Sequence, residues 1–143
     1  NQFLNCKYAS GNVIAISAKV ERELESMDSD LRQIWMNELC IAYSGVDSII
    51  RKSYEALSLI SFFTCGPKEV HAWTVKKGEG IKVAAGEIHT DLQRGFISAT
   101  VISYDDIFEL GSEQNVKNSG KLKTVGANYI VDDGDIINVN FNV

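Results

Sequence analysis

Residues 59–75 read LISFFTCGPKEVHAWTV, and this stretch decides the fold. Two runs rich in aromatic and β-branched residues, Leu59–Cys65 and Glu69–Val75, flank the tripeptide Gly66-Pro67-Lys68. Such runs favour β-strands, while glycine and proline favour a tight turn. The stretch therefore predicts a β-hairpin.

The pattern downstream of the hairpin predicts one helix followed by another strand. Lys82–Leu92 fits a short helix, and Phe96–Tyr104 fits a strand. Side chains two positions apart share a face of a strand, so we expect Ile97, Ala99 and Val101 to lie together on the buried face of the sheet.

The C-terminal third of the sequence completes a small mixed sheet. Asp105 is expected to cap a brief helix through Leu110. The last strand is the clearest in the sequence, because apolar and polar residues alternate strictly from Ile137 to Val143. Two strands, a helix, a strand, a short helix and two further strands predict an α+β, β-grasp arrangement in which the sheet surrounds one helix.

A different periodicity precedes the hairpin. Val13–Ala18 is a short apolar run typical of a strand buried in a parallel sheet. From Val20, apolar residues recur at helical spacing and predict two helices broken near Ser26–Ser29. Ser44, with Asp47 three residues later, predicts the start of a third helix. The change of period around Leu57–Ser61 places a boundary between residues 1–57 and 58–143.

Composition limits the class of protein. The net charge of -5 and a pI near 5.0 exclude attraction of nucleic acid by the whole surface, so any such contact must be a local patch. Three widely spaced cysteines, Cys6, Cys40 and Cys65, predict reduced thiols and no metal site. With no apolar run long enough to cross a bilayer and no leader pattern, we expect a cytoplasmic protein without membrane contact. Since the chain opens on Asn1 with a strand that lacks neighbours, we expect it to be a piece of a longer protein.

Three groups of residues could carry chemistry. Cys65, His71 and Asp91 are the residue types of a thiol hydrolase, but no nucleophile motif surrounds the cysteine, and we reject this interpretation. The aspartates around Gly134 lack the spacing of a calcium loop and predict a turn. No G-x-x-x-x-G-K-[ST] loop is present to hold phosphates, so no nucleotide hydrolysis is expected from this chain alone.

Positively charged side chains are concentrated around the hairpin. In one interpretation they bind RNA, and Trp73 provides a stacking surface for the bases. The alternative is a solvated sheet edge that lysines protect from association, with the tryptophan in the core. His89 is open to two interpretations as well, either bonding to helix-end carbonyls or contacting RNA. The candidate residues for binding RNA or a partner are Lys68, His71, Trp73, Lys76, Lys77, Lys82, His89 and Arg94.

From about Val13 to its end, the sequence resembles the C-terminal part of the YchF/Obg-like ATPase family. The matching strings are SYEALSLISFFTCGPKEVHAWTVKKG (residues 53–78), AAGEIHTDLQRGFISATVISYDD (84–106), ELGSE (109–113), SGKLK (119–123) and DGDIINVNFNV (133–143). The resemblance implies that residues 58–143 are a TGS domain of β-grasp (ubiquitin-like) fold, and Ile88–Asp91 is similar to the helix signature of TGS domains. It implies that residues 1–57 are the end of a P-loop nucleotide-binding (G) domain plus linking helices.

The resemblance also implies roles. Ser17, Ala18 and Lys19 resemble the loop that lies near the nucleotide base, and ATP or GTP with Mg²⁺ would bind upstream residues. Ribosomes are the family's partners. Two positions depart from the family and remove positive charge: His71 stands where arginine is usual, and Lys123–Asn128 corresponds poorly to a basic stretch.

Two functions of different classes follow. The first is a regulatory and binding region of an Obg-like nucleotide hydrolase, which contacts ribosome or RNA while residues 20–57 link it to its own upstream G domain. The second is a protein-interaction module of β-grasp type without RNA binding. The sequence leaves open the ATP or GTP preference, the partner's identity and the oligomeric state.

Overall fold

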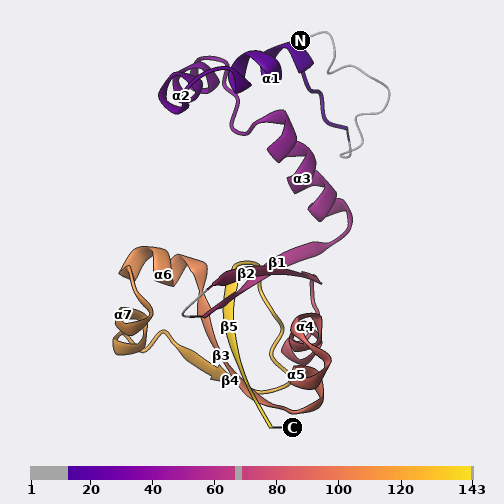
Figure 1. Ribbon diagram of the computed structural model, residues 1–143, viewed down its shortest axis with the longest axis vertical. Helices are drawn as coiled ribbons and strands as arrows, with labels where there is room; N and C mark the ends of the chain where they lie inside the picture. Colours follow the sequence, from indigo (N-terminus) through magenta and orange to yellow (C-terminus); the bar gives the residue numbers. More distant parts are fainter. Residues whose placement is uncertain (1–12, 67–68, 143) are drawn as a thin grey trace. The chain divides into compact units, whose positions relative to one another are not determined.

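The computed structural model describes residues 13–66 and 69–142. They divide into two compact units, the first ending at Leu57 and the second beginning at Ser58 (Figure 1). Five residues named above lie outside the described residues: Asn1, Cys6, Pro67, Lys68 and Val143.

The first unit is helical. It contains α1 (Ala18–Glu25), α2 (Ser29–Glu38) and α3 (Gly45–Ala56). The expected break between the first two helices is confirmed, because Asp28 caps α2 by accepting a bond from the Leu31 N–H at 2.9 Å. The expected start of the third helix is confirmed too, since the Ser44 hydroxyl accepts from the Asp47 N–H at 3.1 Å. These caps satisfy N–H groups that have no partner within the first turn.

The strand expected over Val13–Ala18 is wrong. Residues 13–17 have no regular secondary structure, and Ala18 is already the first residue of α1. A buried strand needs neighbouring strands on both sides, and no described residue pairs with this run. Val13 is 60% exposed, while Ser17 caps α1 by accepting a bond from the Val20 N–H.

The second unit is a five-stranded mixed sheet with helices on both sides (Figure 1). The strand order is β2-β1-β5-β3-β4, where β1 and β5 are parallel and the other pairs antiparallel. The strands are β1 (Leu59–Cys65), β2 (Val70–Lys76), β3 (Phe96–Ser103), β4 (Lys123–Val125) and β5 (Asp135–Phe141). The hairpin and the α+β, β-grasp fold class are thereby confirmed.

Four helices accompany the sheet. In Figure 1, α4 (Ile81–Ile88) and α5 (Thr90–Arg94) lie on one side of the strands, and α6 (Tyr104–Leu110) and α7 (Glu113–Asn118) on the other. The helix expected over Lys82–Leu92 is two helices, because His89 has extended backbone angles and separates α4 from α5. Helix α7 was not predicted from the sequence pattern.

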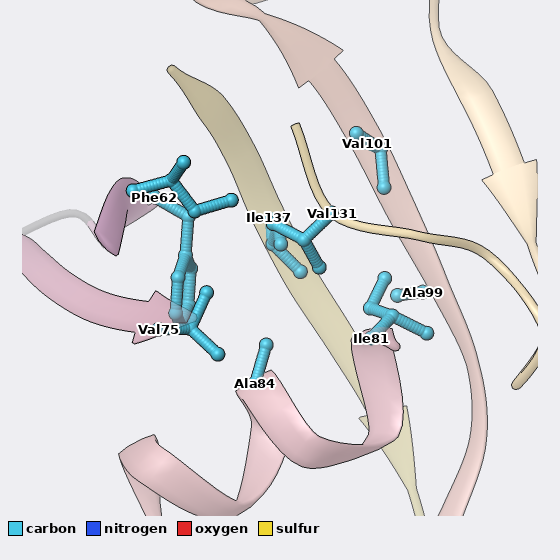
Figure 2. Packing of buried hydrophobic residues seen from close by; sticks show 9 residues of the cluster. Phe62, Val75, Ile81, Ala84, Ala99, Val101, Val131 and Ile137 are labelled. Carbon is cyan, nitrogen blue, oxygen red and sulfur yellow. The ribbon is translucent and has the colours of Figure 1, made fainter. Parts of the chain in front are cut away.

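The core lies between α4 and the covered face of the sheet (Figure 2). Alternate strand residues point inward, as period-two patterning requires. Phe62 and Ile81 are fully buried, and Trp73 packs at the edge of the cluster. The other buried members are Ile60, Val75, Ala84, Ala99, Val101, Val131 and Ile137.

Two expected details differ in the structure. Ile97 is 63% exposed and does not share the buried face with Ala99 and Val101, because the pairing of β3 with β5 shifts register between Phe96 and Ser98. A register shift of this kind turns the side chains on either side of it to different faces. The N-cap of α6 is Ser103 instead of Asp105: its hydroxyl accepts a bond from the Asp106 N–H at 3.1 Å.

Replacing Gly95 with alanine is expected to lower the free energy of unfolding by about 1–3 kcal/mol. A Cβ at this position would lie 2.3 Å from the backbone oxygen of Asn142, and backbone cannot move aside as a flexible side chain can. Urea unfolding followed by circular dichroism measures the change. Gly126→Ala is the control, since its Cβ would meet nothing within 4 Å. Equal stabilities of the two variants would contradict the prediction.

Candidate partner-binding surface

His71 and Trp73 lie on the covered face of β2, which is an edge strand of the sheet. Their ring centroids are 4.3 Å apart with planes tilted by 39°. The indole N–H of Trp73 donates to the Thr64 hydroxyl at 3.0 Å, and the ring packs against the core. Trp73 is therefore mainly a structural residue, and His71 is the exposed ring of the pair.

Three candidate lysines are close together in the chain where β2 leads into α4. Lys76 ends β2, Lys77 follows it in the turn, and Lys82 lies in the first turn of α4. All three side chains are exposed, and within residues 13–66 and 69–142 none of them forms an ion pair. Their charges are therefore available to a ligand.

The other candidates lie at the opposite end of the same helices. His89 links α4 to α5, and its Nδ1 accepts a hydrogen bond from the Asp91 N–H at 3.1 Å, so the ring caps α5. Of the two interpretations of His89, a helix-capping role is thus present in the structure, although the cap is at a helix start. Arg94 is exposed in the last turn of α5.

The candidate residues consequently do not form one cluster. His71 pairs with Thr64 near the hairpin turn, whereas Lys76 pairs with Leu59 at the opposite end of the strands. Five strand residues span about 17 Å, which is far more than one contact distance. Lys76, Lys77 and Lys82 form what we term the lysine end of β2. His71 belongs to the turn end of the hairpin.

An open hollow of about 320 Å³ lies at the turn end. This hollow could not be predicted from the sequence, because its walls come from strands and helices that are distant in the sequence. The apolar part includes Ile88, Leu92 and Phe141, and Thr64 and Cys65 form part of the polar rim.

Ser17, Ala18 and Lys19, predicted to lie near a nucleotide base, begin α1. Ser17 lines an open hollow of about 360 Å³ within the first unit, together with Tyr43 and Gly45. Glu21 closes one side of this hollow, because its Oε1 accepts from the Gly45 N–H at 2.8 Å. The Nζ of Lys19 lies 4.0 Å from Oε1 of Glu23, which is a weak ion pair.

The residues of the rejected hydrolase interpretation do not form one site. Cys65 pairs with Val70, His71 contacts Trp73, and Asp91 lies beside His89 with 3.5 Å between Oδ2 and Nδ1. Among the residues that the structure describes, no group of histidine, cysteine, aspartate and glutamate side chains could hold a metal ion.

The aspartates around Gly134 form the expected turn before the last strand. Asp135 is 4% exposed, and its Oδ2 accepts from the Tyr129 hydroxyl at 2.9 Å and from the Asp132 N–H at 3.0 Å. Asp133 accepts from the Ser61 N–H at 2.8 Å and ties the turn to β1. Burial raises the pKa of Asp135 above its ordinary value, although the two hydrogen bonds oppose the shift. Burial likewise raises the pKa of Tyr129, so this phenol stays a donor.

The raised pKa of Asp135 predicts an inverted pH dependence of stability. The folded protein holds this proton more tightly than the unfolded chain does, so the contribution is fully present below the ordinary pKa of 3.8 and is lost as pH rises through the folded value. Asp135→Asn should therefore lose stability relative to the parent at pH 4 and recover it towards pH 7, as measured by urea unfolding at each pH.

Asp106→Asn is the matched control for this prediction. The hydrogen bond from Lys121, followed by that from Ser103, lowers the pKa of Asp106, so its contribution is present above the ordinary pKa and disappears as pH falls through the folded value. The two variants should therefore differ from the parent with opposite trends in pH. Parallel trends would contradict the role assigned to Asp135.

The fold defines a β-grasp unit preceded by a helical segment, and its relatives identify the family. The family model YchF-GTPase_C, described as "Protein of unknown function (DUF933)", matches residues 59–142. The chain therefore belongs to the family of YchF-type, Obg-like proteins, which confirms the resemblance noted in the sequence.

Named relatives agree with this assignment. The chain is 41% identical over 140 residues to the "Ribosome-binding ATPase YchF" of Bacillus subtilis, covering 96% of this chain and 38% of that protein. It is 46% identical over 137 residues to "Obg-like ATPase 1" of Homo sapiens, covering 95% and 34%. The chain thus spans between a third and two fifths of the length of these relatives.

A solved structure is similar in fold. The Schizosaccharomyces pombe YchF GTPase superposes on 90% of this chain and 34% of its own, with a TM-score of 0.76 at 34% identity.

Across residues 13–66 and 69–142, no helix is both long enough and apolar enough to cross a bilayer.

Proposed function

We propose that this chain is the binding and regulatory region of a longer Obg-like nucleotide hydrolase, and that its β-grasp unit contacts a ribosome through ribosomal RNA. The observation that carries the proposal is the lysine end of β2, where Lys76, Lys77 and Lys82 are exposed and unpaired within the described part of the chain. On a protein of net charge -5, such a patch gives phosphate a local point of contact. Relatives bearing the name "Ribosome-binding ATPase YchF" support the choice of partner.

Nucleotide hydrolysis belongs, in this proposal, to residues outside this chain. The sequence has no phosphate-cradling loop, and the described residues contain no group of three or more histidine, cysteine, aspartate and glutamate side chains that could hold a metal ion. Because this sequence lacks the loop that holds nucleotide phosphates, no hydrolytic step is assigned to these residues. Ser17, Ala18 and Lys19 are proposed to approach the base of a nucleotide bound by the longer protein.

The first unit is proposed to join the β-grasp unit to the upstream G domain. Its helices expose large apolar residues, including Ile34 and Trp35 of α2 and Ile50 of α3, at 58%, 46% and 52%. Exposed apolar residues that share a region mark a surface that another structure covers. A nucleotide-dependent movement of the upstream domain would then change the placement of the lysine end.

A salt titration of ribosome binding tests this function. The longer protein, loaded with ATP, is sedimented with purified ribosomes between about 50 and 300 mM KCl. We expect the logarithm of the binding constant to fall linearly with the logarithm of salt, with a slope of about -2 to -3, because about three lysines would displace counterions. Absence of binding at the lowest salt, or a slope near zero, would refute the proposal.

The alternative is a protein-interaction module without RNA contact. Its supporting observation is that β2 stands at one end of the sheet order and that its Val70 is 67% exposed. An extended peptide can add to such an edge through main-chain hydrogen bonds. Binding of a protein partner that persists at high salt and survives reversal of the lysine charges would favour this alternative.

A further inference from the structure

A separate surface, distant in sequence from the lysine end, lies on α6. The four most exposed residues of this helix share one face, because each lies three or four positions from another of them and such positions are neighbours on a helix surface. They are Tyr104, Asp105, Phe108 and Glu109, which we term the α6 face. Tyr104 is 52% exposed and Phe108 is 78% exposed. Two aromatic rings thus lie in solvent beside two carboxylates.

The rings of the α6 face contact each other. Their centroids are 6.0 Å apart with planes inclined by 26°. No larger apolar cluster covers them within the described chain, since Ile107 and Leu110 on the opposite side of the helix are the half-buried residues. The outward faces of the rings carry negative electrostatic potential, which attracts a cation placed over them.

The helix that carries this face is held by polar contacts at its start and through Asp106 and Glu109. Ser103 caps its start, with the Oγ of Ser103 2.6 Å from Oδ2 of Asp106. Lys121 approaches Oδ1 of Asp106 at 2.7 Å and Oε2 of Glu109 at 3.1 Å. Gly111 ends the helix in the left-handed conformation at φ 77°. The α6 face is therefore preorganised, which lowers the entropy cost of binding.

The charge of the side chains around the α6 face determines which sign of charge a partner must carry. The α6 helix itself contains three carboxylates, Asp105, Asp106 and Glu109, and no lysine, arginine or histidine. Lys121 is already bound to Asp106 and Glu109, and Asp105 has no ion pair among the described residues. The resulting negative potential repels phosphate and attracts cations. A cationic ligand is thus favoured over RNA at the α6 face.

We propose that the α6 face binds an arginine-bearing segment of a protein partner. A guanidinium group is planar, so it can stack on an aromatic face and bond to a carboxylate oxygen at the same time, which an ammonium group does less well. Phe108 and Tyr104 supply the stacking faces, and Asp105 supplies the acceptor. The inference is independent of the proposed function, since it uses none of the lysine-end residues.

A peptide titration tests this inference. The probe is a fluorescein-labelled dodecapeptide of alternating arginine and glycine, and binding to the 143-residue chain is followed by fluorescence anisotropy. Phe108→Ala and Asp105→Asn should each weaken binding about two- to fivefold, the size expected for one exposed cation–π or charge contact. Both positions are exposed, so neither substitution should unfold the protein.

Two matched variants control for general effects. Phe141→Ala makes the same truncation at an exposed phenylalanine of β5, and Glu87→Gln removes one exposed carboxylate of α4. Both should leave peptide affinity within about 1.5-fold of the parent, since surface changes away from a site have small effects. Unchanged affinity in Phe108→Ala, or equal losses in all four variants, would overturn the proposal. So would tighter binding of a labelled single-stranded oligonucleotide that depends on Phe108.

Discussion

Replacing Phe62 with alanine is expected to lower the free energy of unfolding of the β-grasp unit by about 3–5 kcal/mol. Phe62 is 0% exposed and lies opposite Trp73 in the pairing of β1 with β2. Its ring fills the space between the sheet and α4, as Figure 2 shows. Removing it forfeits its transfer from water and leaves a cavity that the surrounding side chains fill only in part.

The loss should be large compared with the total stability of a domain of this size. Domains are stable by only about 5–15 kcal/mol, so Phe62→Ala should shift the urea midpoint strongly or leave the unit partly unfolded without denaturant. Phe108→Ala removes the same ring at a position that is 78% exposed, and it should change stability by no more than about 0.5 kcal/mol. A similar loss in both variants would show that the core is not centred on Phe62.

Most of the fold could be predicted because alternation fixes which side chains of a strand face the core. Phe62 and Ile60 in β1, and Val75 in β2, are buried at alternate positions. The hairpin followed from these positions together with the glycine and proline between the strands. Helix starts could be predicted for a similar local reason: Ser44 satisfies an N–H three residues away in the chain.

The errors have non-local causes. The apolar run from Val13 reads as a strand, yet a strand forms only where partners pair with it, and the described residues supply none. Ile97 alternates with Ala99 in the sequence, but a register shift against β5 turns it outward. The break between α4 and α5 depends on the extended backbone conformation of His89, which the periodicity of the side chains does not indicate.

The residue types of the candidate site could be predicted from the sequence, but the positions of these residues relative to one another could not. Lysines and aromatic residues can be counted in the sequence, whereas the pairing of β1 with β2 decides that His71 and Lys76 lie at opposite ends of the strands. The burial of Asp135 against Tyr129 had no local signature, because an aspartate beside glycine is typical of a solvated turn. From the sequence, Phe108 could be identified only as an apolar residue of a short helix, because its exposure is set by the fold.

Reversing the charges of Lys76 and Lys77 together should weaken ribosome association by at least about tenfold at low salt, which corresponds to about 1.4 kcal/mol. Each reversal removes an attraction to phosphate and adds a repulsion. Both side chains are exposed, so folding should be unaffected, and circular dichroism checks this. The measurement is sedimentation of the longer protein, carrying Lys76→Glu and Lys77→Glu, with purified ribosomes.

The position of the charges, rather than their number, is what this experiment must isolate. Lys117→Glu reverses an exposed lysine of α7 that likewise has no ion pair among the described residues, and it should change affinity by less than about twofold. The salt slope of the double variant should also become shallower, because two fewer lysines displace counterions. If Lys117→Glu weakens binding as much as either single reversal at the lysine end, net charge determines the association and the lysine end is not its site. If the double variant binds as the parent does while retaining a protein partner, the protein-interaction alternative replaces the ribosome proposal.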